Sequence, residues 1–148
     1  NSFKTEILTA THNFTNSTGN TFKLALYSSN SATLSKSTTA YTAPSDGTAD
    51  PTNTYEVTST SSGYTTGGNS LTSTTPALSG DTACCLFAST SWGSSASFTA
   101  RGCLIYNSSA SNKAVCVVNF GADKTVTTGT FTVEFPAQTA GNAIIQIA

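Results

Sequence analysis

The second half of the chain is a series of short segments rich in β-branched and aromatic residues, separated by Ser, Asn and Gly. These segments are 82–89, 96–100, 102–107, 113–121, 124–128, 129–136 and 142–148. In the sixth of them, Phe131, Val133 and Phe135 alternate with Thr132 and Glu134, which is the period of a strand with one buried face. Many short strands at this spacing are typical of a sandwich or a barrel. We therefore expect an all-β fold.

The first half carries fewer strand signals. Apolar and polar residues alternate through 21–28, which predicts a half-buried strand, and 54–58 predicts a shorter one. Residues 29–53 are polar and contain several turn signals, so they predict a long surface loop. In the second half, the run from Ala114 to Val118 is apolar throughout, as in a central strand covered on both faces.

Composition agrees with strands and turns. Ser and Thr account for 22 and 29 of the 148 residues, whereas charged residues make up only 9%. Thr favours pleated surfaces, Ser favours turns, and low charge argues against a disordered chain. The net charge is −1 and the six basic residues are scattered, so no basic face is expected for nucleic acid. No run of about 20 apolar residues is present to cross a membrane, so we expect a soluble single domain.

The N-terminal residues predict one helix, over 3–14, with Ser2 as its cap and a break at 16–20. Its apolar residues are Phe3, Ile7, Leu8 and Phe14. We expect an arm over 1–20 and an antiparallel β-sandwich, jelly-roll or immunoglobulin-like, over 21–148. Docking on its own sandwich is the default fate of an amphipathic helix. Docking on a neighbouring subunit or on a partner surface stays open.

Catalytic chemistry has few side chains to use. His12 is the single histidine, and the seven acidic residues lie mostly beside turns. Neither a phosphate-binding loop nor a nucleophile elbow is present. Cys84 and Cys85 are adjacent, a spacing that does not suit a zinc site. We expect no enzymatic activity, no cofactor and no metal.

Two cysteines fall on a predicted hairpin formed by 102–107 and 113–120. If Asn107 pairs with Asn112, Cys103 lies directly opposite Cys116. Facing positions have Cβ atoms ~4.5–5.5 Å apart, whereas a disulfide prefers about 3.8 Å. We therefore expect two neighbouring reduced thiols packed in the core, and a cross-strand disulfide is the alternative.

Trp92 lies in a small polar segment, STSWGSSAS. An exposed tryptophan would serve as a sugar platform or as an anchor in an interface. The other interpretation is a residue at the edge of the core whose indole N–H bonds to backbone, and single tryptophans are usually largely buried. Burial is the favoured interpretation.

Four stretches resemble a family of small tailed-bacteriophage virion proteins, described variously as head decoration, head fibre or tail-associated proteins. They are TFKLALYSS (21–29), SGYTTGG (62–68), SWGSSASFTARGCLIYN (91–107) and NFGADKTVTTGTFTVEFP (119–136). The resemblance runs from about Phe3 to the C-terminus. None of these stretches is a catalytic motif, so the resemblance implies a role rather than a mechanism.

The resemblance implies a β-sandwich present in many copies on the virion, assembled in the host cytoplasm. The expected function is capsid decoration, with the major capsid protein or other virion proteins as partners. Closed symmetry is the rule for homo-oligomers, and a trimer is the favoured state. The expected partner-binding residues are Phe3, Ile7, Leu8, Phe14 and Trp92. The alternative function is a tail-fibre or receptor- or carbohydrate-binding module that uses the loops at 29–53 and 59–80.

Overall fold

The computed structural model describes residues 1–28, 34–42, 55–58, 61 and 63–148. Its elements are α1 (Ser2–Leu8), β1 (Phe22–Tyr27), β2 (Asn69–Leu71), β3 (Ala77–Ser79), β4 (Thr82–Cys85), β5 (Thr90–Asn107), β6 (Lys113–Val133) and β7 (Ile145–Ile147). The strands form two antiparallel sheets, ordered β2-β1-β5-β6 and β3-β4-β7. The expected all-β, sandwich-like fold with one short N-terminal helix is confirmed.

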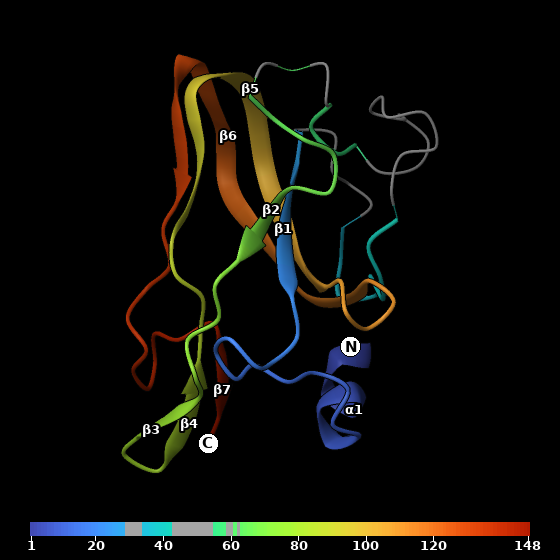
Figure 1. The fold of residues 1–148 in the computed structure, drawn as a ribbon, viewed down its shortest axis with the longest axis vertical. Helices are drawn as coiled ribbons and strands as arrows, with labels where there is room; N and C mark the ends of the chain where they lie inside the picture. Colours follow the sequence, from blue (N-terminus) through green and yellow to red (C-terminus); the bar gives the residue numbers. More distant parts are fainter. Residues whose placement is uncertain (29–33, 43–54, 59–60, 62) are drawn as a thin grey trace.

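Strands β5 and β6 form a long ribbon that folds over itself. Figure 1 shows both strands rising to the top of the molecule and turning over there, so that the two halves of the ribbon face each other. Their pairing is interrupted at four places, including the stretch from Trp92 to Phe98 and the step from Ala100 to Gly102. Irregularities of this kind bend a strand and increase its twist. The sequence predicted separate short strands here because the small residues at these bends resemble turns.

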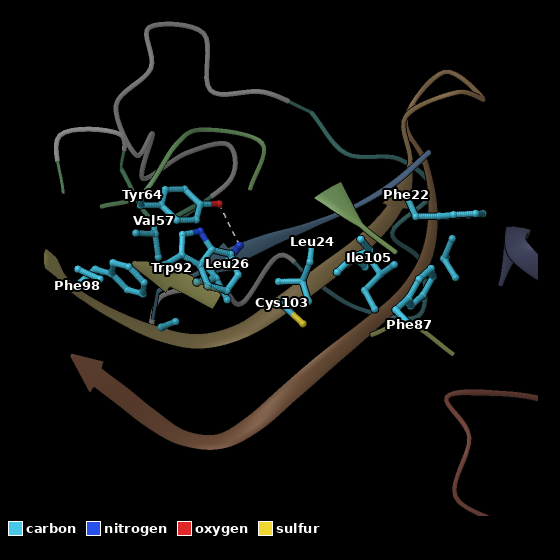
Figure 2. Packing of buried hydrophobic residues seen from close by; sticks show 14 of the residues in the cluster. Phe22, Leu24, Leu26, Val57, Tyr64, Phe87, Trp92, Phe98, Cys103 and Ile105 are labelled. Carbon is cyan, nitrogen blue, oxygen red and sulfur yellow. Dashed lines mark hydrogen bonds between the residues drawn. The ribbon is translucent and has the colours of Figure 1, made fainter. Parts of the chain in front are cut away.

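The main core lies inside this fold. Figure 2 shows Leu24, Leu26, Cys103 and Ile105 on the concave side of the curved ribbon, with Trp92 beyond them. All five side chains are buried. The alternation of apolar and polar residues in 21–28 therefore predicted correctly that Leu24 and Leu26 face the core.

A second buried cluster covers the other face of the main sheet. It consists of Ala25, Tyr27, Tyr41, Leu104, Tyr106 and Ala114. Tyr41 comes from the segment 34–42 and stacks on Tyr106, with the ring centroids 4.4 Å apart. Strand β1 is therefore buried on both faces and not half-buried as predicted. Strand β6, predicted to be central, is an edge strand, although its first residues do contact both clusters.

The helix is shorter than predicted: α1 ends at Leu8, and Asn1, not Ser2, precedes it as the N-cap residue. Ala10 has a φ of 56°, which is incompatible with a continuing right-handed helix. The chain then runs on so that Phe14 stacks on Phe22, with ring centroids 4.5 Å apart. The packing of Phe14 on Phe22 thus prevails over the continuous helix that the spacing of the apolar residues predicted.

The β5–β6 hairpin is confirmed, but its predicted register is wrong. Asn107 pairs with Lys113, and after a further irregularity Cys103 lies opposite Val118 while Cys116 lies opposite Ile105. Asn112 has a φ of 59°, so it belongs to the turn and not to the strand. All four cysteines are free.

Candidate interaction surface

Three of the four apolar residues of the arm pack against its own domain. Phe14 is only 6% exposed, and Phe3 and Ile7 lie half-buried against the same core. Leu8 points away and is 86% exposed. The structure therefore separates the predicted partner-binding residues into a docked group and one exposed side chain.

A chain of polar contacts, some buried and some partly exposed, holds the arm in place. Lys113 Nζ donates to Glu6 Oε1 at 2.9 Å, and His12 Nε2 lies 3.0 Å from Glu6 Oε2. Asn107 Nδ2 donates to His12 Nδ1 at 3.1 Å and to Asn20 Oδ1 at 3.0 Å. Because Nδ1 accepts, the neutral imidazole carries its proton on Nε2 and donates it to Glu6. We call Glu6, His12, Asn20, Asn107 and Lys113 the arm latch.

Electrostatics favour the charged form of Glu6 within the latch. Burial disfavours the carboxylate, but hydrogen bonds from Lys113 and His12 outweigh it and lower the pKa of Glu6 below its ordinary value. The pairing of Glu6 with His12 was not predicted, because a helix continuing to Phe14 would place His12 elsewhere. The signal that could have found it is the presence of the lone histidine and an acid within one short apolar segment.

An apolar surface lies beside the docked helix. Leu78, Ala83 and Ile147 form one cross-strand row of the small sheet. Leu78 is 75% exposed and Ile147 is 59% exposed, and together with Leu8 these are the exposed large apolar side chains of the described residues. Figure 1 shows α1 and the small sheet at the same end of the molecule.

A small hollow of about 90 Å³ joins the helix to this sheet. It is lined by Ile7, Phe14, Pro76, Ala83, Cys84, Cys85, Ile145 and Ile147. Ile7, Ala83 and Ile147 line this hollow, Leu78 continues the row of Ala83 and Ile147, and the exposed Leu8 follows Ile7 in α1. We call these five residues the apolar end. Sequence reasoning found Ile7 and Leu8 but missed the other three, because their row depends on which strands pair.

Trp92 does not belong to this surface. It is 3% exposed and packs among Tyr64, Phe98 and Phe131. This is the buried interpretation, except that Nε1 has no hydrogen-bond partner in the described structure. Of the two loops expected to bind a receptor, residues 29–33, 43–54, 59–60 and 62 lie outside the described residues.

Glu56 is a second buried carboxylate, and its contacts serve the structure of the protein. Glu56 accepts hydrogen bonds from Tyr64 Oη at 2.6 Å, from the Gly67 backbone N–H at 2.6 Å and from Tyr41 Oη at 2.9 Å. Burial outweighs these bonds and raises the pKa of Glu56. Glu56 is fully buried, so its carboxylate links Tyr41, Tyr64 and Gly67 inside the protein.

The thiols of Cys85, Cys103 and Cys116 are poor nucleophiles. Burial raises the pKa of Cys85 to about 11 and that of Cys116 to about 12, and it raises the pKa of Cys103 further. Nucleophilic cysteines need the opposite shift. Cys103 and Cys116 occupy diagonal positions on neighbouring strands, so they lie near each other without facing directly.

Within the part of the chain that the structure describes, no group of three or more His, Cys, Asp or Glu side chains could hold a metal ion. The same residues contain no helix with the length and apolar character needed to cross a bilayer. Comparison with known proteins finds no matching family model, no similar curated protein and no similar solved structure. We therefore base the proposed function on the apolar end.

Proposed function

We propose that this chain is a bacteriophage virion structural protein, a capsid decoration protein that binds the outside of the shell through its apolar end. The observation that carries the proposal is the exposure of Leu78 and Ile147 in one row of the small sheet, next to α1 with its exposed Leu8. Contiguous exposed apolar patches on folded proteins mark sites of interaction. The resemblance of the sequence to phage virion proteins supports the choice of partner, the major capsid protein or another virion protein.

The energetics suit a partner with an apolar groove. Burial of a Leu or Ile side chain contributes roughly 1.5–3 kcal/mol, so the three exposed side chains could provide most of a stable contact. A particle also presents many equivalent sites, so modest affinity per copy suffices when copies touch one another. The outer face of the β5–β6 ribbon carries Ser91, Thr99, Thr125 and Thr132, which pair through their hydroxyl groups and suit exposure to water.

The alternative, a tail-fibre or receptor- or carbohydrate-binding module, was expected to use the loops at 29–53 and 59–80 together with an exposed Trp92. That side chain is buried, so this observation no longer favours the alternative. The decoration function is accordingly the one that we propose.

The experiment is co-sedimentation with expanded shells of the phage that encodes the chain. Leu8→Glu combined with Ile147→Glu should weaken binding by at least roughly tenfold, because two charges would enter an apolar contact. Thr127→Glu is the matched control, since Thr127 is exposed on β6, which belongs to the four-stranded sheet and not to α1 or the small sheet. Equal binding by wild type and the double variant, or loss with Thr127→Glu alone, would refute the proposed surface.

A further inference from the structure

We propose that the open edge of β6 at residues 130–134, together with the hollow beside it, binds an extended peptide segment of a partner protein. The segment carries apolar side chains that enter the hollow, a basic residue that pairs with Glu134 and an acidic residue that pairs with Lys124. This surface is separate from the apolar end, so the inference goes beyond the proposed function and does not depend on it.

The last part of β6 pairs with a strand on one side only. Phe131, Thr132 and Val133 lie opposite residues 90–92 of β5. In the described part of the chain β6 is the last strand of its sheet, and Figure 1 shows this part of it descending at the outside of the ribbon. The backbone N–H and C=O groups on the open side of an edge strand can pair with a further strand. An extended peptide is the kind of occupant that uses such groups.

An open hollow of about 350 Å³ lies along this edge. Its apolar lining consists of Phe120, Phe131 and Val133, which are half-buried and pack against the main core. Phe131 also contacts the buried ring of Trp92, with the ring centroids 5.9 Å apart, so the core supports the floor of the hollow. An apolar side chain placed on this floor would be removed from water, which favours binding.

Two charged side chains of opposite sign line the same hollow. Lys124 precedes the place where the ribbon turns over, and Glu134 directly follows the last residue of β6. Both side chains are exposed, and neither belongs to the three ion pairs found among the described residues. Free charges of both signs select a partner that carries the complementary charges. They favour a peptide over a purely apolar occupant such as a lipid chain.

The two faces of the strand match a peptide with alternating side chains. Phe131 and Val133 face the core, whereas Thr132 and Glu134 are exposed on the outer face. In a strand added to this edge, the residues opposite Phe131 and Val133 turn into the hollow, and the residue opposite Glu134 turns outward. The other end of the added strand lies toward the place where the ribbon turns over, as Lys124 does. The expected pattern is therefore charged, apolar, polar, apolar and charged, with opposite charges at the two ends.

The probe for this site is a fluorescein-labelled peptide with blocked ends, Lys-Val-Thr-Phe-Asp, whose antiparallel pairing places its Lys opposite Glu134. Fluorescence anisotropy should show saturable binding to the wild-type protein. Glu134→Lys should weaken binding roughly fivefold or more, and a peptide with Glu in place of its Lys should recover most of that loss. Lys124→Glu should weaken binding of the original peptide by a similar factor.

Asp81→Lys is the matched control, because it makes the same change of charge at an exposed position in the turn between β3 and β4. It should bind the peptide as the wild-type protein does. Absence of saturable binding, or equal binding by wild type and either charge variant of the hollow, would overturn the inference.

Methylation of the peptide backbone tests the pairing with the edge and needs no variant of the protein. In an antiparallel pair, alternate residues of a strand direct their N–H groups toward the partner strand. One peptide carries N-methyl groups on its Val and Phe, and a second carries one on its Thr. One of the two should lose binding and the other should keep it. Equal effects of the two methylations would show that the peptide does not add as a strand, and the inference would then be wrong.

Sedimentation velocity of the protein alone distinguishes a partner peptide from a second copy of this chain. Glu134→Lys should leave the oligomeric state of the protein unchanged. Dissociation of an oligomer by Glu134→Lys would make a second copy the occupant of this edge and would contradict the inference. None of these measurements contains shells, so a failure of the peptide site and a failure of co-sedimentation are separate results.

Discussion

Single residues of the arm show that tertiary contacts outweigh the local preference of the sequence for a continuous helix. Glu6 and His12 are both buried and face one another, although the spacing of the apolar residues predicted one continuous helix over 3–14. The left-handed backbone at Ala10 makes this contact possible. No local pattern encodes it, since Ala rarely adopts that conformation. Leu8, by contrast, was identified from the sequence as a partner-binding residue and is exposed.

The latch predicts a pH-dependent stability. Glu6→Gln removes a charged acceptor from Lys113 and His12 and should lower the free energy of unfolding by about 1–3 kcal/mol at neutral pH. The folded-state pKa of Glu6 is depressed, so its contribution is present above the ordinary pKa of a glutamate and is lost as the pH falls through the folded value. Urea unfolding of both proteins from pH 7 down to pH 3 should show the difference closing.

Lys113→Gln serves as the control for the latch. It removes the other partner of the charge pair and should reproduce part of the loss. A gap between wild type and Glu6→Gln that widens in acid would contradict this assignment.

At the scale of elements, the alternation of apolar and polar residues predicted which face of a strand is buried. It did not predict which strands pair or in what register. Alternation in 21–28 indicated that Leu24 and Leu26 face the core, because period two is a property of one strand. The register of the β5–β6 hairpin depends instead on where the turn ends, and the left-handed Asn112 moves that point by one residue. The row from Leu78 to Ile147 needs the local β3–β4 hairpin and also the pairing of β4 with the distant β7, so no local signal could reveal all of it.

The docking of the arm predicts unequal effects of two similar truncations. Phe14→Ala removes a buried ring that stacks on Phe22 and should cost about 3–5 kcal/mol of unfolding free energy. Leu8→Ala removes an exposed side chain and should change stability by less than about 0.5 kcal/mol. Chemical denaturation measures both. Similar losses for the two variants would mean that the arm does not dock as described.

At the scale of the whole molecule, a buried carboxylate and two thiols contrast with an exposed apolar surface. Glu56 and the thiols of Cys85 and Cys103 are buried, whereas the apolar end lies open on α1 and the small sheet. The all-β class was predictable because it follows from many local alternations together. The small sheet and the docked arm, which create the apolar end, follow from long-range pairing and were not.

We propose above that this molecule binds a larger particle through its apolar end. If the proposed function is right, the chain lies on virions, and cryo-electron microscopy of intact virions that contain it gives both position and copy number. We predict hundreds of copies per particle on the outer face of the shell, with α1 and the small sheet turned toward the shell. Density confined to the tail, or copies whose apolar end faces solvent, would contradict the account.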